Sequence, residues 1–138
     1  MLMISGDDMK KHLTVKQKNR YTDEKSLMFE GHVEFIKKGS LISIEYMEHD
    51  QATIVKIHAD KDELRLERKG EIQTNLLFRH METTQGSVLS EFGTIDLGVY
   101  THKYIRKENI IALEYDILSE GEVTDGYRIL WILKEDQA

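Results

Sequence analysis

The sequence contains no cysteine and no proline in its 138 residues. Without cysteine, the chain can form no disulfide bond, offers no thiolate nucleophile and cannot build a zinc site on sulfur. Proteins of reducing compartments do without disulfides, so we expect a cytoplasmic location. The absence of proline leaves glycine, asparagine and aspartate as the strong turn-forming residues.

Long hydrophobic runs are also missing. The first four residues, Met1 to Ile4, are apolar, but Gly6, Asp7 and Asp8 follow almost at once. So short a run can form neither the apolar core of a signal peptide nor a membrane-spanning segment. We therefore expect no membrane partner.

An excess of basic residues is absent as well. The formal net charge is -6, and acidic residues outnumber basic ones from Glu108 onward. Lys16, Lys18 and Arg20 are spaced by two residues, which predicts one solvated strand face. A nucleic-acid-binding surface needs a larger basic patch that neutralises phosphates, so we expect no nucleic-acid partner.

The composition is that of a folded, water-soluble protein. Hydrophobic residues make up 40% of the chain and charged residues 32%, which is enough apolar material for one core. We expect a single domain over residues 1–138. Residues 1–10 are predicted to be a loosely ordered extension, in which Asp7 to His12 could form one helical turn.

Alternation of apolar and polar residues indicates β-strands along the rest of the chain. Val55 and Ile57 alternate with Lys56 and His58, and the same period of two recurs in later segments. Turn-forming residues, among them a Gln85-Gly86 pair, separate these segments at short intervals. The predicted strands cover residues 12–20, 26–37, 40–48, 52–59, 63–69, 71–79, 87–92, 94–105, 109–119 and 123–134.

The short links between these strands predict an all-β fold in which neighbours in sequence are neighbours in the sheet. A single antiparallel up-and-down barrel of about 8–10 strands removes the exposed edges of an open sheet. A sandwich is the alternative. Apolar sets such as Ile95, Leu97 and Val99 are expected to face the interior, and Phe92 and Trp131 to belong to the core or its cap.

Charged residues at interior positions are the best candidates for a site. Arg68 follows the apolar row of its strand, Glu48 follows another such row, and Tyr46 precedes Glu48. Paired at the mouth of a barrel, the guanidinium and carboxylate could bind the polar end of a small ligand. The alternative is that both lie past the buried rows and reach water. Thr53 and Thr101 are weaker ligand-binding candidates.

Sequence motifs for catalysis or metal binding are lacking. No serine lies in a nucleophile elbow, and the glycines match no phosphate or dinucleotide loop. The six histidines have no helical or alternating spacing, and Glu48, His49 and Asp50 are turn neighbours that rarely converge on one ion. We predict no catalytic residue, no metal and no cofactor.

Several short motifs occur along the chain: Tyr46-x-Glu48, the segment Thr53 to Ile57, Glu63-Leu64 leading to Arg68-x-Gly70, Phe78, and Phe92-Gly93 followed by Leu97 and Thr101. Together they resemble the YwiB-like family of small bacterial proteins. The resemblance covers roughly residues 10 to 134. It implies a calycin-like, lipocalin-type β-barrel and supplies no substrate, cofactor or catalytic residue.

Two functions from different classes remain open. The first is a non-catalytic barrel that binds a small, partly apolar ligand in its lumen through Arg68 and Glu48. The second is a structural or interaction protein with a filled core, which could form a homodimer. A cavity inside the barrel would favour the first and a filled interior the second.

Overall fold

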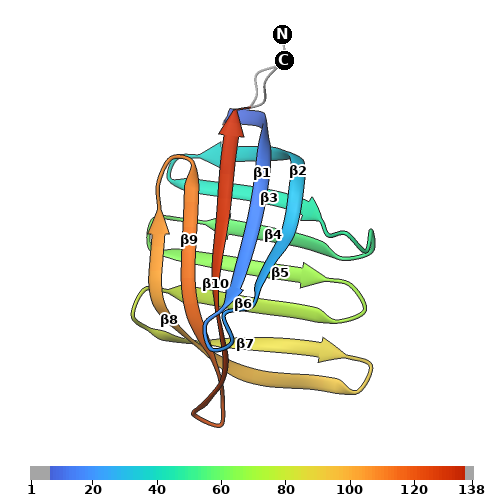
Figure 1. Ribbon diagram of the computed structural model, residues 1–138, viewed down its shortest axis with the longest axis vertical. Helices are drawn as coiled ribbons and strands as arrows, with labels where there is room; N and C mark the ends of the chain where they lie inside the picture. Colours follow the sequence, from blue (N-terminus) through green and yellow to red (C-terminus); the bar gives the residue numbers. More distant parts are fainter. Residues whose placement is uncertain (1–6, 136–138) are drawn as a thin grey trace.

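The computed structural model describes residues 7–135, with the side chains of residues 7–9 left out (Figure 1). This part of the chain is all β and contains no helix of the length and apolar character needed to cross a membrane. Its strands are β1 (Asp7–Asn19), β2 (Lys25–Lys38), β3 (Leu41–Met47), β4 (Ile54–Ala59), β5 (Glu63–Lys69), β6 (Gln73–Arg79), β7 (Thr83–Ser90), β8 (Gly93–Arg106), β9 (Ile110–Ser119) and β10 (Glu122–Glu135).

The strands form one closed barrel in which each strand pairs with the next along the chain, always antiparallel. The barrel closes where β1 pairs with β10, from Lys11 opposite Glu135 to Asn19 opposite Tyr127. The predicted up-and-down barrel is therefore confirmed, and the sandwich alternative is wrong.

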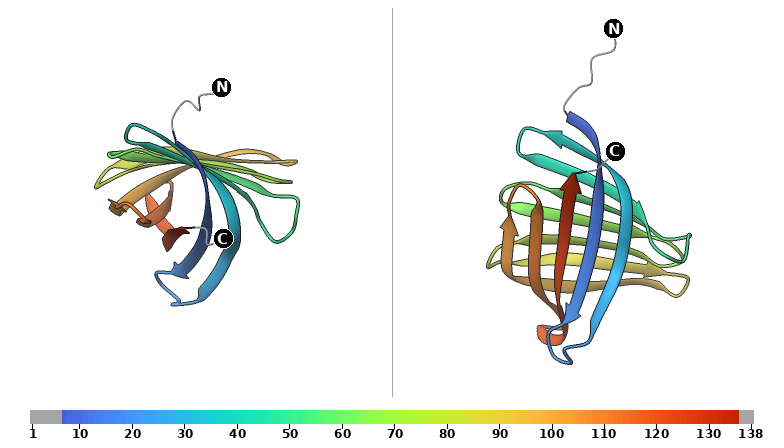
Figure 2. Two further views of the ribbon diagram at one scale, coloured as in Figure 1. Left: turned by 90° about the horizontal axis from the view of Figure 1, so that it is seen from above. Right: turned by 45° about the horizontal axis from the view of Figure 1, so that its top comes forward.

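Strands of two different directions make up the wall of the barrel. The long strands β1, β9 and β10 cross the direction of the shorter β3 to β7, and β2 and β8 each bend from one direction to the other (Figures 1 and 2). The register of β8 shifts between Thr101 and Lys103, at its bend. β2 pairs with β3 only over Glu34 to Lys38, so the first half of β2 separates from its neighbour.

One end of the barrel is closed by packed side chains and by polar contacts from β8 to the end of β4 and the β4–β5 loop. Phe78 and Leu64 face each other on β6 and β5, and both are fully buried. The Tyr104 hydroxyl donates to the Asp60 carbonyl at 2.5 Å. The Arg106 guanidinium donates to the Ala59 carbonyl at 3.0 Å. These contacts leave the opposite end, near the β3–β4 and β5–β6 loops, as the open one.

The strand prediction was wrong for β7, which begins at Thr83 rather than at residue 87. The chain turns at Met81, whose φ is 61°, and Gly86 lies inside the strand. A Cβ on Gly86 would lie 2.7 Å from Leu76 Cδ2 and 2.9 Å from Leu97 Cδ1. This glycine gives room to two core side chains, so it does not mark a turn.

The N-terminal prediction also needs correction. β1 begins at Asp7, which pairs with Lys37 of β2, so the helical turn expected over Asp7 to His12 is wrong. Backbone pairing with β2 satisfies groups that a single helical turn would leave unpaired. Residues 7–10 belong to the sheet, and the rest of the predicted extension lies outside the described residues.

Two apolar residues expected in the core lie at the surface instead. Phe92 is 92% exposed and Ile95 is 63% exposed. β8 pairs with β9 only from Gly98 onward, so the tip of the β7–β8 hairpin extends past the rest of the barrel. Trp131, in contrast, is 1% exposed, as predicted for a core residue.

Candidate functional site

A cavity of about 370 Å³ occupies the open half of the barrel and is lined by side chains from all ten strands. Most of its wall is apolar, and Trp131 forms part of it. The polar or charged members of the wall are Gln17, Tyr46, Glu48, Arg68, Thr74, Tyr115 and Tyr127. The sequence therefore places a small number of polar groups around an apolar chamber, which is the usual composition of a ligand pocket.

Glu48 and Arg68 meet at the mouth of this cavity. Arg68 Nη2 lies 2.7 Å from Glu48 Oε1, and Arg68 Nε lies 3.1 Å from Glu48 Oε2, so the guanidinium binds both carboxylate oxygens. The Glu48 side chain is 13% exposed and that of Arg68 is 42% exposed. The expected pairing is confirmed, and only Arg68 reaches water to a substantial extent. The hydrogen bond to Glu48 raises the pKa of Arg68.

Tyr46 lies in the wall beside this pair. Trp131 Nε1 donates to the Tyr46 hydroxyl at 3.3 Å, and the ring of Phe29 lies 4.8 Å from that of Tyr46. Burial raises the pKa of Tyr46 to about 12, so the phenol stays protonated at physiological pH. Within residues 7–135 we find no acceptor for its own O–H.

Thr53 does not line the cavity, although it is buried. Its hydroxyl donates to Asp50 Oδ2 at 2.5 Å, and its backbone N–H donates to Asp50 Oδ1 at 2.8 Å. The Glu48 N–H in turn donates to the Thr53 carbonyl at 2.9 Å. Thr53 therefore shapes the β3–β4 loop that carries Glu48, and its contacts supply no reason to expect ligand binding by its hydroxyl.

The hydrogen bonds around Asp50 give a testable titration. The Thr53 hydroxyl is the main cause that lowers the pKa of Asp50 to about 2. Thr53→Val should therefore raise this pKa toward the ordinary value of about 3.9, as measured by carboxyl carbon NMR shifts against pH. Thr53→Ser keeps the hydroxyl and should keep the low value. An unchanged pKa in Thr53→Val would contradict the assignment.

The same shift has a definite sign for stability. Because the pKa of Asp50 is lower in the folded state, the ionised carboxylate stabilises the fold. This contribution to the free energy of unfolding is complete above about pH 3.9 and is lost as the pH falls toward 2.

Thr101 is fully buried on β8, opposite Tyr115 of β9, and its hydroxyl has no hydrogen-bond partner within the described residues. It is not part of the cavity wall. The structure thus brings together Tyr46, Glu48 and Arg68 and separates Thr53 and Thr101 from them.

Four polar residues of the cavity wall were missed as candidates. Tyr115 packs between Phe78 and Tyr127, at ring distances of 4.7 and 5.9 Å, and burial raises its pKa. Gln17 follows the apolar position Val15 by two residues near the end of β1, and Thr74 precedes the apolar position Leu76 by two residues near the start of β6. The rule that selected Glu48 and Arg68 would have found these residues too. Those missed are Gln17, Thr74, Tyr115 and Tyr127.

A second polar cluster lies outside the cavity and centres on Asp116 of β9, which is 6% exposed. Asp116 accepts hydrogen bonds from the Tyr21 hydroxyl at 2.7 Å and from Arg20. His102 Nε2 lies 2.7 Å from its other oxygen. Burial acts to raise the pKa of Asp116, but the bonds from His102, Tyr21 and Arg20 outweigh it and hold the pKa below its ordinary value. The cluster fastens the β1–β2 loop to β8 and β9.

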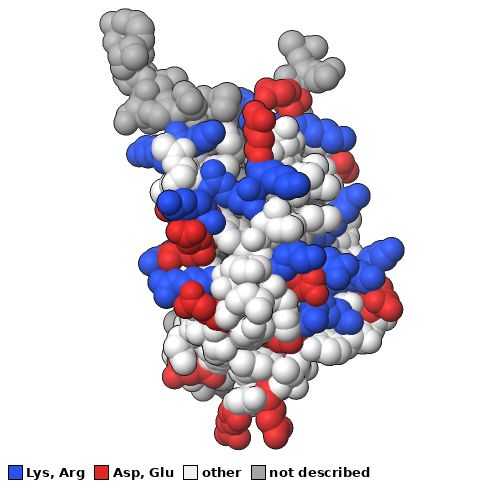
Figure 3. Space-filling view, turned by 90° about the vertical axis from the view of Figure 1, so that its left-hand side faces the viewer, with Lys and Arg blue, Asp and Glu red and all other residues white. Residues whose placement is uncertain are grey.

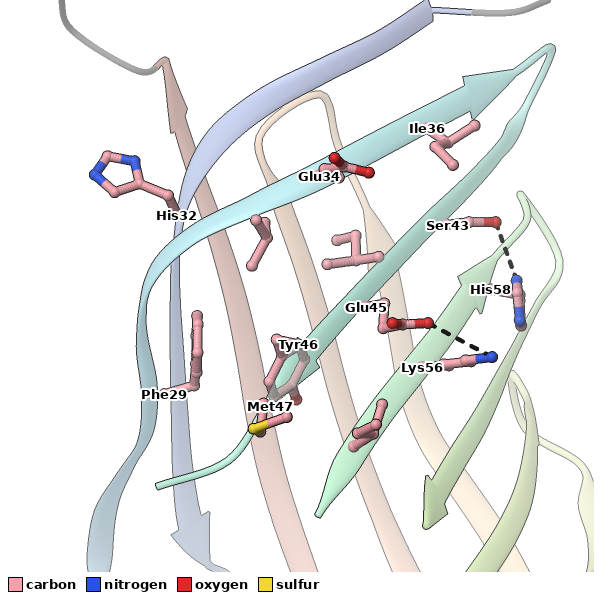
Figure 4. A pocket seen from close by; sticks show the side chains of 13 residues that line it. Phe29, His32, Glu34, Ile36, Ser43, Glu45, Tyr46, Met47, Lys56 and His58 are labelled. Atoms are coloured by element: carbon pink, nitrogen blue, oxygen red, sulfur yellow. Dashed lines mark hydrogen bonds and ion pairs between the residues drawn. The ribbon is translucent and has the colours of Figure 1, made fainter. Parts of the chain in front are cut away.

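A groove of about 600 Å³ lies on the other side of the wall, where β2 and β3 separate (Figure 4). Ser43 Oγ and His58 Nδ1 lie 3.0 Å apart in it, and Lys56 Nζ lies 3.5 Å from Glu45 Oε1. Lys56 therefore points outward, as its position in the alternation predicts. Most polar groups drawn in the groove are already paired across neighbouring strands.

Comparisons with known proteins agree with this architecture. A family model described as "Domain of unknown function (DUF1934)" matches residues 11–130. The crystal structure of the ywiB protein from Bacillus subtilis is 16% identical in sequence, with a TM-score of 0.75 and coverage of 94% of each chain. A search of curated proteins gave no match. The resemblance to a YwiB-like barrel is confirmed, and the structural similarity at this identity concerns the fold alone.

Proposed function

Since the chain belongs to the DUF1934 family of unknown function, we propose a function from its own geometry: the barrel binds a small, partly apolar molecule in its lumen. The observation that carries the proposal is the cavity of about 370 Å³ with the Glu48–Arg68 pair at its mouth. Apolar contact with the wall would supply most of the affinity, and the polar groups would orient the ligand.

The size of the cavity supports binding over a purely structural role. Ligand pockets commonly have volumes of about 300–1,000 Å³, whereas side chains usually fill protein interiors to high density. Here the closed half of the barrel is packed around Leu64 and Phe78, while the half beside Trp131 retains a chamber. A protein that needed only a filled core would gain stability by closing this chamber.

Arg68 can take part in binding without breaking its ion pair. The contacts with Glu48 use Nε and Nη2, which leaves the N–H groups of Nη1 available. Glu48 holds the guanidinium in one orientation, and a fixed guanidinium loses less conformational entropy when a ligand binds.

Native mass spectrometry and a thermal-shift panel test the proposal. We expect the wild-type protein to retain a copurified molecule or to gain thermal stability with at least one class of small apolar compound. Arg68→Ala should weaken this gain. Arg65→Ala is the matched control, because Arg65 lies on the same strand, is 65% exposed and pairs with Glu63. If no compound class stabilises the wild type and no ligand copurifies, the proposal is wrong.

A homodimer is the second candidate, and the separation of β2 from β3 favours it. Strand β2 forms no strand pair with β3 before Glu34 within the described residues, and the neighbouring groove includes Met47, which is 47% exposed. An unpaired strand edge can accept a strand from a second copy. Analytical ultracentrifugation should then detect a dimer that Met47→Lys weakens, and a monomer at all concentrations would refute it.

Two other expectations stand as parts of the proposal. We propose that the protein works in the cytoplasm, on the absence of cysteine. We also propose that the barrel is related to the calycins, as the resemblance of its motifs implies.

A further inference from the structure

We infer that the cavity selects an uncharged ligand, with an apolar body and a carbonyl-type oxygen as hydrogen-bond acceptor, over the carboxylate or ammonium compound of the same size. The inference rests on the proposed function and specifies the ligand class. Three features of the described residues carry it: unused donors in the wall, a charge balance at the mouth that is already negative, and acidic loops around the opening.

The wall of the cavity offers hydrogen-bond donors that have no acceptor. Tyr46 is 7% exposed and its hydroxyl accepts from Trp131, but we find no acceptor for its O–H within residues 7–135. Tyr115 is 5% exposed, and we find no hydrogen bond from its hydroxyl in the same part of the chain. Because no protein acceptor competes for these O–H groups, a ligand oxygen in the cavity that accepts from them gains a hydrogen bond there.

The charge at the mouth disfavours an anion. Glu48 already neutralises Arg68 through two oxygens. Asp50, in the same loop as Glu48, is held ionised by its hydrogen bonds and acts on Arg68 from nearby. The three groups together carry a negative charge, and a ligand carboxylate would add another in a site partly shielded from water.

The loops around the open end extend this field. The β9–β10 turn carries Glu120 and Glu122, and the β7–β8 turn carries Glu91. Figure 3, which faces the side opposite the β3–β4 and β5–β6 loops, shows acidic side chains at the lower end of the molecule, where the β9–β10 hairpin turns. Such a field lowers the local concentration of anions at the opening.

A cationic ligand would meet this field favourably but would not satisfy the wall. An ammonium group brings only donors, so the O–H groups of Tyr46 and Tyr115 would stay without acceptors. It would also approach the Arg68 guanidinium, of the same charge. An uncharged acceptor meets neither penalty.

Three ligands with the same apolar body test the inference: 2-nonanone, nonanoate and nonylamine. Trp131 is the only tryptophan in the sequence and lines the cavity, so its fluorescence reports binding at pH 7. We expect the ketone to bind at least about tenfold more tightly than either charged compound. Tyr46→Phe should weaken the ketone by about 5–10-fold, the usual value of one hydrogen bond.

Glu48→Gln provides the decisive variant, because it keeps the size of the side chain and one acceptor oxygen for Arg68 while removing one negative charge. It should shift the ratio of ketone to nonanoate affinity toward nonanoate by at least about tenfold, while circular dichroism confirms an unchanged fold. Glu45→Gln, on the outer surface and paired with Lys56, should leave the ratio unchanged.

The outcomes separate the inference from the proposed function. If nonanoate or nonylamine binds most tightly, or if Glu48→Gln leaves the ratio unchanged, the inference is overturned and ligand binding stands. If none of the three binds while another compound of the thermal-shift panel stabilises the protein, the inference is again overturned and ligand binding stands. If nothing in either experiment binds the wild type, both fall.

Discussion

Replacing Phe78 by alanine is expected to lower the free energy of unfolding by about 3–5 kcal/mol. Phe78 is fully buried in the closed half of the barrel, and its ring lies 4.7 Å from that of Tyr115. Its removal would leave a cavity that the surrounding strands cannot fill, because β6 is paired with β5 along its whole length and cannot move inward alone. Urea denaturation, monitored by circular dichroism, measures the loss.

Phe92→Ala is the matched control, because it deletes the same side chain from a position that is 92% exposed. The tip of the β7–β8 hairpin makes little contact with the core, so the expected change is within about 0.5 kcal/mol. Comparable losses from the two variants would contradict the assignment of Phe78 to the core and of Phe92 to the surface.

Asp116→Ala is expected to lower the free energy of unfolding by about 1–3 kcal/mol. The substitution removes the shared acceptor of Tyr21, His102 and Arg20. The ion pair between Arg20 and Glu114 then remains to hold the β1–β2 loop to β9. Part of the loss is offset because these donors can turn toward water. Asp96→Ala, at an exposed position of β8, should change the stability by no more than about 0.5 kcal/mol.

The effect of Asp116→Ala should also depend on pH. The pKa of Asp116 is lower in the folded protein than its ordinary value. Its ionised form therefore stabilises the fold fully above about pH 3.9, and this contribution is lost as the pH falls through the folded-state pKa. Urea denaturation at pH 7 and at pH 3 should give a smaller difference between wild type and variant at pH 3. An equal or larger difference at pH 3 would contradict the role of the carboxylate.

Most of the barrel could be predicted because its strands follow a period of two and its links are short. Both are local properties of the sequence. Beyond them, an up-and-down barrel requires only that each strand pair with the strand that follows it in the sequence. The start of β7 was mispredicted because a glycine such as Gly86 can mark either a turn or a close approach of a neighbouring side chain. Only the three-dimensional position of Leu76 shows that the second explanation applies. Ile95 was misplaced because the period does not say where a strand outruns its partner.

The candidate site was predictable only for residues that continue the alternation of apolar and polar side chains along a strand. Glu48 and Arg68 stand at interior positions past apolar rows, so the sequence predicts their meeting. The role of Thr53 depends on a loop conformation around Asp50 that no period describes. In the Asp116 cluster, Tyr21 and Arg20 bind a carboxylate that lies 95 and 96 positions later in the sequence. No local sequence pattern connects residues so far apart.

The pairing of β1 with β10 affects the folding process of the chain as well as its folded structure. β1 gains its second partner only when β10 is in place, so closure joins segments from Lys11 and Glu135. Such distant pairing gives a high contact order and predicts slow folding, on the millisecond-to-second scale. Until then β1 exposes an unpaired edge that can bind other chains. Because the chain has no proline, a slower phase cannot come from prolyl isomerisation, and barrel closure is the step that would account for it.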